Sequence, residues 1–258
     1  MSSIVLEQIE NLGVIKLNRP DKLNSFNREM ALSLQSTLDK CESDDSIRCI
    51  LIIGEGRAFC AGQDLEEAIS KEGPELRKIV EEHYNPIIKK LRKIELPIVA
   101  AVNGVAAGAG ANIALACDIV VATKSASFIQ AFSAIGLIPD SGGTFTLPRL
   151  IGWQKASALM MLGDKIKADE AERMGMIYKV FENESFLEES MKLATKLSKM
   201  PTQGLGLTKR ALNASFTNNL DDQLKLEEQL QTMAGQTYDY QEGVNSFLEK
   251  RRPNFKGE

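Results

Sequence analysis

The fold of this chain depends on residues 96–118, which read LPIVAAVNGVAAGAGANIALACD. Residues 97–102 form an apolar run that is long enough for a buried strand and too short for an ordinary helix. Asn103-Gly104 is a turn signal, and Gly108 and Gly110 follow it. Residues 111–117 are good helix formers without a charge. The pattern predicts a strand, a glycine turn and a buried helix.

The predicted turn aims free backbone N–H groups of the first helical turn, and the positive end of the helix dipole, at one point. A negative oxygen would be stabilised there. Close packing of small residues in a buried helix is an alternative interpretation, and it stays open at this point. A dinucleotide-binding turn is disfavoured, because Ile113 occupies the position of its third glycine and Asp118 precedes the next apolar run.

The composition narrows the classes of function. The length of 258 residues suits one large domain, or one domain with a helical appendage. The net charge of −4 argues against nucleic acid as a partner. The start MSSIVLEQIE lacks the regions of a signal peptide, and no apolar window approaches the length of a membrane span. We therefore expect a cytoplasmic protein with neither nucleic-acid nor membrane partners.

The cysteines and the single histidine predict neither a metal site nor a catalytic nucleophile with a histidine base. Cys41, Cys49, Cys60 and Cys117 have no CxxC spacing, so we expect free thiols. His83 lies in a charged helical stretch, where nothing in the sequence pairs it with a nucleophile. No cluster supplies enough ligands for zinc.

Strands and helices alternate up to about residue 122, which favours an α/β fold. We expect a hairpin with Asn11-Leu12-Gly13 at its turn, a helix that starts at Asn27, and a long helix that Pro86 kinks. The expected strands are 4–10, 14–17, 49–53, 98–102, 119–122 and 127–132, and the two helices are 27–41 and 76–94. A glycine-rich loop at 135–144 opens a further helix.

After Trp153 the chain becomes mostly helical. The expected helices are 156–162, 168–174, 186–200, 201–216, 220–235 and 238–250, and residues 177–181 are the expected strand. The apolar faces of the last helices, which include Leu224, Leu226 and Leu230, exceed what a small helical tail could bury alone. We expect them to cover the core or a neighbouring subunit.

Two glycine turns carry the predicted chemistry. They are FCAGQDL at 59–65 and NGVAAGAG at 103–110, and each would present backbone N–H groups at the end of a buried strand. Two such donors that face one point make an oxyanion hole, which stabilises an enolate or a tetrahedral oxyanion.

Motifs along nearly the whole chain resemble the enoyl-CoA hydratase/isomerase (crotonase) superfamily. They are FCAGQDL, AVNGVAAGAGANIALACD, IGLIPDSGGTFTLPRLIG, ADEAERMGMIYKV and FLEKRRPNFK, in that order. The resemblance implies a crotonase-like (ClpP/crotonase) α/β spiral of ββα units over residues 1–195 and a helical oligomerisation region over residues 196–258. It implies a homotrimer or a dimer of trimers that binds acyl-CoA thioesters. The thioester oxygen would bind the N–H groups of Ala61 and Ala109. No cofactor is expected, because coenzyme A is part of the substrate.

The departures from the hydratase pattern favour an isomerase. The two glutamates with which a hydratase delivers water match Asn112 and Phe132, and neither side chain transfers protons as a carboxyl group does. Asp140 stands in the IPDSGGT loop, where hydratases usually carry glycine. This resembles the isomerases of the superfamily, most closely those that act on the ring epoxide of phenylacetyl-CoA. One base suffices to move a double bond, and Phe132 would keep the site dry and the carboxylate basic.

Each of these three residues also has a plain structural interpretation. Asp140 fits the N-cap of the helix that follows it. Asn112 either packs inside its helix or hydrogen-bonds near the substrate. Phe132 is either a core residue or a substrate contact.

Further substrate contacts follow from the resemblance. Lys22 and Leu23 match the loop at the nucleotide end of coenzyme A. The residues that match the thioester and adenine side are Ala58, Ala61, Gln63, Asp64 and Leu65, and Gly108 joins them at the second turn. Phe247 and Lys250 match positions that a neighbouring subunit contributes. Lys250-Arg251-Arg252 would meet a phosphate, or would simply be a solvated basic helix end.

Three hypotheses about function stay open on the sequence. The first is an acyl-CoA isomerase with Asp140 as its acid and base, in which a ring-epoxide substrate ranks above a 3-enoyl-CoA. The second is an enoyl-CoA hydratase of fatty-acid oxidation, with water held by Asp140 and Asn112. The third is a catalytically silent relative that binds acyl-CoA or RNA.

Overall fold

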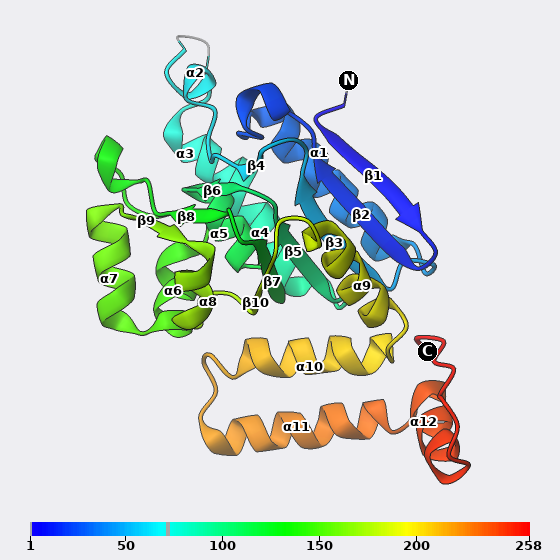
Figure 1. The fold of residues 1–258 in the computed structure, drawn as a ribbon. Helices are drawn as coiled ribbons and strands as arrows, with labels where there is room; N and C mark the ends of the chain where they lie inside the picture. Colours follow the sequence, from blue (N-terminus) through cyan, green and yellow to red (C-terminus); the bar gives the residue numbers. More distant parts are fainter. Residues whose placement is uncertain (1, 71–72) are drawn as a thin grey trace.

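The computed structural model describes residues 2–70 and 73–258. In this part of the chain the strands form one sheet in the order β1-β2-β3-β5-β7-β10 and another in the order β4-β6-β8-β9 (Figure 1). The strands of the first sheet are β1 Ile4–Ile9, β2 Leu12–Leu17, β3 Cys49–Gly54, β5 Ile98–Val102, β7 Ile119–Thr123 and β10 Lys179–Phe181. The strands of the second sheet are β4 Ala58–Cys60, β6 Val105–Ala107, β8 Ser127–Ile129 and β9 Lys165–Lys167.

Consecutive strands divide between the two sheets in a repeating way. The strands β3, β5 and β7 lie in the first sheet, and each is followed after a short turn by β4, β6 or β8 in the second. Helical segments follow each pair. The pairs β3–β5 and β5–β7 are parallel, and every residue of β5 is buried, as expected for a sheet covered on both faces. This confirms the expected α/β spiral of ββα units.

Helices cover the first sheet on both faces. The helices of the body are α1 Arg28–Ser43, α2 Leu65–Ala68, α3 Leu76–Lys78, α4 Asn85–Lys93, α5 Ala109–Leu115, α6 Gly143–Ile151, α7 Trp153–Leu162, α8 Ala168–Arg173 and α9 Phe186–Ser198. Ile50 and Ile52 face the main core with α1, α4 and α5, whereas Cys49 and Leu51 face a second core under α9. The alternation follows from the two-residue period of a strand.

The structure corrects several expected boundaries. The hairpin turn is Glu10-Asn11, because Leu12 is buried and pairs with Ile9 in the ladder. The expected glycine turn contains the strand β6, and α5 begins at Ala109. The strand expected to reach Phe132 ends at Ile129, and a short 3-10 turn, η3 Ser133–Ile135, follows. The strands β4, β6 and β9 are also absent from the prediction, because each has only three residues.

The expected long helix over 76–94 is interrupted before its proline. A π-helical segment, η2 Ile79–Tyr84, separates α3 from α4, and Pro86 lies in the first turn of α4. Proline has no N–H to donate, so the backbone rearranges its hydrogen bonds in the preceding turn. The expected start of α1 at Asn27 is confirmed, because the Asn27 side chain caps this helix by accepting a hydrogen bond from Met30 N at 3.0 Å.

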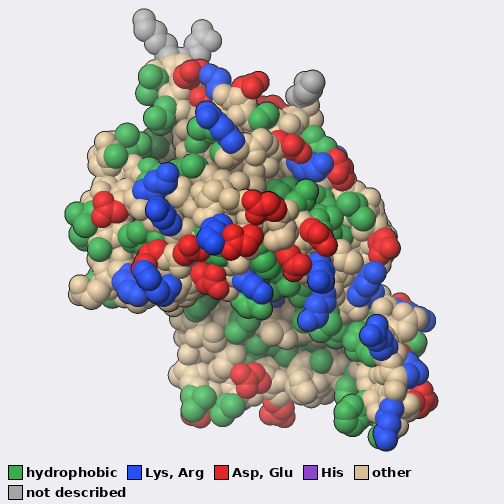
Figure 2. Space-filling view, viewed as in Figure 1, with side chains coloured by type: hydrophobic (Ala, Val, Ile, Leu, Met, Phe, Trp, Pro, Cys, Tyr) green, Lys and Arg blue, Asp and Glu red, His purple; other side chains and the backbone are tan. Residues whose placement is uncertain are grey.

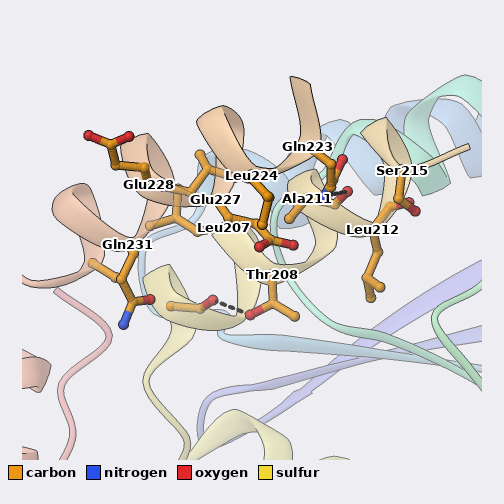
Figure 3. Close-up of a pocket in the computed structure, with 13 residues that line it drawn as sticks. Leu207, Thr208, Ala211, Leu212, Ser215, Gln223, Leu224, Glu227, Glu228 and Gln231 are labelled. Atoms are coloured by element: carbon orange, nitrogen blue, oxygen red, sulfur yellow. Dashed lines mark hydrogen bonds between the residues drawn. The ribbon is translucent and has the colours of Figure 1, made fainter. Parts of the chain in front are cut away.

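The last helices extend beyond the body. The helices α10 Thr202–Ala214 and α11 Leu220–Ala234 lie side by side, and α12 Tyr238–Leu248 follows at their end (Figure 1). A groove of about 720 Å³ lies between α10 and α11, with Leu207, Ala211 and Leu224 on its walls (Figure 3). The exposed apolar side chains of this region include Leu212, Leu220, Leu224, Phe247 and Leu248.

The face drawn in Figure 2 mixes positive and negative side chains, with no large area of one sign. Among the described helices, none is both long and apolar enough to cross a membrane.

Candidate active site

A cavity of about 170 Å³ lies between the two glycine turns. Residues 61–63 of the turn after β4 line one side, and Gly108 and Ala109 at the start of α5 line another. Leu76, Ile79, Phe132 and Leu137 contribute apolar walls. The polar side chains on the cavity are those of Gln63, Tyr84 and Asp140. The cavity is therefore mostly apolar, with a few polar groups directed into it, as small-molecule sites usually are.

The two turns touch each other through Gly62. Its φ of +98° belongs to the region that favours glycine. A Cβ at this position would lie 3.0 Å from the carbonyl oxygen of Ala107 and 3.6 Å from the amide nitrogen of Ala109. A side chain would thus push into the start of α5. Gly108, the N-cap of α5, also has a positive φ of 52°, and this turns the Ala109 N–H outward at the helix N-terminus.

The structure corrects the expectation that the Ala61 N–H is one of the two donors to the thioester oxygen. Ala61 lines the cavity, but its N–H is already donated to the carbonyl oxygen of Leu23 at 3.0 Å. Among the described residues, neither the N–H of Gln63 nor that of Ala109 donates a hydrogen bond. Both residues line the cavity. The free donors at the two turns are therefore the N–H groups of Gln63 and Ala109. At the first turn the donor lies two residues after Ala61, and at the second turn it is the expected residue.

The side chain of Gln63 is held in place by its neighbours. The Tyr84 hydroxyl donates to Gln63 Oε1 at 2.7 Å, and Gln63 Nε2 donates to Glu67 Oε2 at 3.3 Å. Burial raises the pKa of Tyr84 well above its ordinary value, so the phenol stays protonated and remains a donor. Tyr84 ends the π-helical segment, a kind of segment that is frequent at functional sites.

Asp140 brings a carboxyl group to the cavity. Burial raises the pKa of this carboxyl, and a hydrogen bond of 2.8 Å from the Ser141 hydroxyl opposes the rise. The capping interpretation is wrong, because the N-cap of α6 is Gly142 and the cap has no side-chain hydrogen bond. Asp140 is the one carboxylate among the described residues that line the cavity.

The structure separates the roles that the sequence left open for Phe132 and Asn112. Phe132 is buried and also lines the cavity, so it is both a core residue and a wall. Asn112 does not line the cavity, which corrects the expectation of a substrate contact. Its Nδ2 instead donates to the backbone carbonyl of Asp140 at 2.8 Å from the buried interior of α5.

The other expected contacts are more scattered. Leu65 and Gly108 line the cavity. Asp64 caps α2 and pairs with Arg19 at 2.9 Å, and the exposed Lys22 pairs with Glu66 at 2.8 Å. Leu23 acts through its carbonyl, which holds the Ala61 N–H. Ala58 is buried in β4, where its carbonyl accepts from Asn24 at 2.8 Å, and it does not line the cavity.

Two expected contacts lie on another part of the chain. Phe247 on α12 lines a groove with residues of α10 and the C-terminal segment, and Lys250 follows α12 with a positive φ of 56°. Neither lines the cavity of its own chain. His83 is buried beside Arg28 and is not among the residues that line the cavity.

Eight of the residues that line the cavity were not expected from the sequence, and only Gly62, Ile135 and Leu137 among them lie within a family motif. The eight are Gly62, Ala68, Leu76, Ile79, Tyr84, Ala131, Ile135 and Leu137. Most of them are apolar side chains of short helical segments, and nothing in the sequence distinguishes them from core residues. For the Gln63 N–H, the only available signal was its place directly after the positive-φ glycine of the turn.

Comparisons with known proteins agree with this geometry. Residues 7–258 match the family described as enoyl-CoA hydratase/isomerase. The chain is 48% identical to the 1,2-epoxyphenylacetyl-CoA isomerase of Escherichia coli K12, with 100% of both chains covered. It is 35% identical to the 2,3-dehydroadipyl-CoA hydratase of the same organism, again with 100% of both covered. The crystal structure of an enoyl-CoA hydratase from Bacillus anthracis matches with a TM-score of 0.92 at 31% identity, covering 99% of this chain and 100% of that one. This chain is an enzyme of the enoyl-CoA hydratase/isomerase (crotonase) family.

Proposed function

We propose that this enzyme is an acyl-CoA isomerase in which Asp140 moves a proton and the N–H groups of Gln63 and Ala109 hold the thioester oxygen. One observation carries the proposal: within the described part of the chain, a mostly apolar cavity is lined by a single carboxylic acid, Asp140, and by Gln63 and Ala109, whose backbone N–H groups donate no hydrogen bond. Gln63 takes the role expected for Ala61, whose N–H is already bonded.

The proposed chemistry needs one base and no second reactant. The ionised Asp140 takes a proton from the carbon next to the thioester carbonyl, and the electron pair spreads onto the thioester oxygen as a dienolate. The two N–H groups stabilise that oxygen, where loss of one donor typically costs roughly 3 kcal/mol of transition-state stabilisation. The protonated Asp140 then returns its proton to the far carbon of the dienolate, and the double bond has moved. Coenzyme A takes part only as the carrier of the acyl group.

The surroundings of Asp140 support isomerisation over hydration. By the resemblance to the family, Asn112 and Phe132 match the positions of the two hydratase glutamates, and neither side chain can deprotonate water. Phe132 also lines the cavity, where it excludes water and contributes to the burial that raises the pKa of Asp140. A base of higher pKa removes a proton more readily from a weak carbon acid.

For the substrate we favour the ring epoxide of phenylacetyl-CoA over a 3-enoyl-CoA. The support is the 48% identity to a protein named 1,2-epoxyphenylacetyl-CoA isomerase. The cavity volume of about 170 Å³ fits a compact ring, since an apolar cavity of about 150 Å³ can hold benzene. This would place the enzyme in phenylacetate breakdown.

The test is mass spectrometry of products formed in deuterated water from 3-hexenoyl-CoA and crotonyl-CoA, and then from the ring epoxide. From 3-hexenoyl-CoA we expect deuterium incorporation with a shifted double bond and no added water, and from the ring epoxide an isomer without added water; Asp140→Asn should turn over neither. Rapid water addition to crotonyl-CoA would favour the hydratase, for which the 35% identity to a hydratase speaks. Acyl-CoA binding without turnover of any of the three would favour a silent relative.

We also propose that residues 196–258 assemble the enzyme into a trimer or a dimer of trimers. The exposed apolar side chains of α10 to α12, such as Leu220 and Leu224, are the support, because a second copy would remove them from water. Phe247 and Lys250 of one copy would then reach the coenzyme A bound by another, alongside its Lys22. Light scattering after gel filtration tests this: the trimer mass is expected, and Leu224→Glu should release monomers, with a monomeric parent enzyme as the contrary result.

A further inference from the structure

A chain of two buried side-chain amides leads to the backbone of Asp140. Gln130 Nε2 donates to Asn112 Oδ1 at 2.8 Å, and Asn112 Nδ2 donates to the Asp140 carbonyl oxygen at 2.8 Å. The three residues come from different elements, because Gln130 directly follows β8, Asn112 lies inside α5, and Asp140 precedes α6. Gln130 and Asn112 are each only 2% exposed.

The hydrogen bonds of this chain can run in only one direction. A carbonyl oxygen accepts and never donates, so the Asp140 carbonyl requires the NH₂ end of the Asn112 amide. The Asn112 oxygen then faces Gln130 and requires its NH₂ end in turn. Gln130 Oε1 is buried and has no partner among the described residues. Gln130 therefore leaves an acceptor unsatisfied while its donor serves Asn112, a cost that is accepted in proteins chiefly where a specific orientation is needed.

The Asn112 amide also packs against the loop that leads from Asp140 into α6. A Cβ on Gly143 would lie 2.8 Å from Asn112 Cγ, so the amide packs directly on the backbone at the start of α6. The Asp140 carbonyl accepts a second hydrogen bond of 2.9 Å, from Gly143 N. Two donors thus hold one carbonyl, and the side chain of the same residue is left to face the cavity.

We propose that Asn112 and Gln130 are positioning residues, which hold the backbone of Asp140 so that its carboxylate meets the substrate. The proposal rests on the proposed role of Asp140. Asn112 acts through the Asp140 carbonyl, and Gln130 acts only through Asn112 by fixing the orientation of its amide. Neither side chain touches substrate, since neither lines the cavity.

The test compares kcat and KM of the isomerase reaction in Asn112→Leu, Gln130→Met and the double variant. A misplacement of about 1 Å can cost about 100-fold, so we expect Asn112→Leu to lose about 10- to 100-fold in kcat, with KM within about threefold. The double variant should lose no more than Asn112→Leu alone, because Gln130 has no effect without Asn112. A purely structural role would give additive losses of stability and leave kcat of the folded fraction unchanged.

Asn213→Leu is the matched control. The Asn213 amide also bridges two elements, donating to the Arg92 carbonyl at 2.8 Å, but it lies on α10 and does not line the cavity. It should cost stability without changing kcat. If Asn112→Leu fails to fold, Gln130→Met decides the question, with a fall in kcat supporting the proposal and an unchanged kcat refuting it. Asp140→Asn distinguishes a failure of the proposed function from a failure of the positioning role. Full activity in Asp140→Asn would overturn the proposed function. An inactive Asp140→Asn together with a fully active Asn112→Leu would overturn only the positioning role.

Discussion

The hydroxyl of Tyr84 donates a hydrogen bond of 2.7 Å to the side-chain oxygen of Gln63. Tyr84 ends the π-helical segment before α4, and Gln63 follows the glycine turn after β4. The bond therefore fixes the residue whose N–H is free at the cavity by means of a side chain from a separate helix. An oxyanion donor is effective only when its position is set in advance.

Tyr84→Phe should lower kcat about 2- to 10-fold, which corresponds to one hydrogen bond of ordinary net strength. The ring stays and only the hydroxyl is lost, so the cavity keeps its shape and KM should change little. Steady-state kinetics with a 3-enoyl-CoA measure this. Tyr178→Phe, on an exposed ring away from the cavity, is the control and should match the parent enzyme. An unchanged kcat in Tyr84→Phe would show that Gln63 needs no anchor.

The pH dependence of the reaction should report the buried carboxyl of Asp140. Its pKa is raised by burial, so the fraction of ionised base falls as pH falls through a value above the ordinary aspartate range near 4. We expect kcat/KM to decline on the acid side with that raised pKa. Asp140→Asn should lose about 100- to 10,000-fold and the acid limb with it. An acid limb that survives in Asp140→Asn would assign it to another group.

Asp140→Asn should also make the folded protein more stable at neutral pH. The raised pKa means that the folded state binds the proton more tightly than the unfolded state does. Ionised Asp140 therefore costs stability above its folded-state pKa, and the cost disappears as pH falls to the unfolded value near 4. Thermal melts at pH 7 and pH 4 test this. The melting temperature should rise only at the higher pH, whereas Asp45→Asn, at an exposed turn, should show no such difference.

Phe132→Ala should lower the apparent pKa of the acid limb and reduce kcat, because water enters the space left by the ring and solvates the Asp140 carboxylate. The cost in stability should be about 3 to 5 kcal/mol, as for other buried phenylalanines. Phe186→Ala is the matched control, since Phe186 is similarly buried but is the first residue of α9 and packs in the second core, away from the cavity. The control should lose stability and keep the parental pH profile. A parental profile in Phe132→Ala would mean that other walls keep Asp140 desolvated.

Gly62→Ala should abolish most of the activity, whereas Gly152→Ala should not. Both glycines have positive φ, +98° and +78°, so alanine costs about 1 to 3 kcal/mol of backbone energy at either site. Only at Gly62 does the added Cβ meet the backbone next to Ala109, while Gly152 has open space. Comparable melting temperatures with a loss of kcat confined to Gly62→Ala would confirm the close approach of the two turns. Equal kcat values would contradict it.

The sequence predicted the elements whose signal is local. The apolar run of β5, the Asn27 cap of α1 and the glycines around α5 each act within a few residues, and the structure has them close to the expected positions. The alternation of strands and helices up to about residue 122 followed from the same local signals. The sequence did not predict β4, β6 and β9, because each has only three residues and lies in or beside a turn signal, so that pairing with a partner strand defines it.

The sequence by itself determined an α/β fold, the two glycine turns and the single acidic residue in the IPDSGGT loop. These depend on apolar period, on backbone conformations that glycine favours, and on residue identity, all of which are written along the chain. Tertiary structure alone decided which N–H groups are free. The carbonyl oxygen that accepts the Ala61 N–H belongs to Leu23, which lies far from Ala61 in the sequence. Tertiary structure also decided that Asn112 faces the Asp140 backbone and not the cavity. A hydrogen bond needs two partners, and the sequence shows only one at a time.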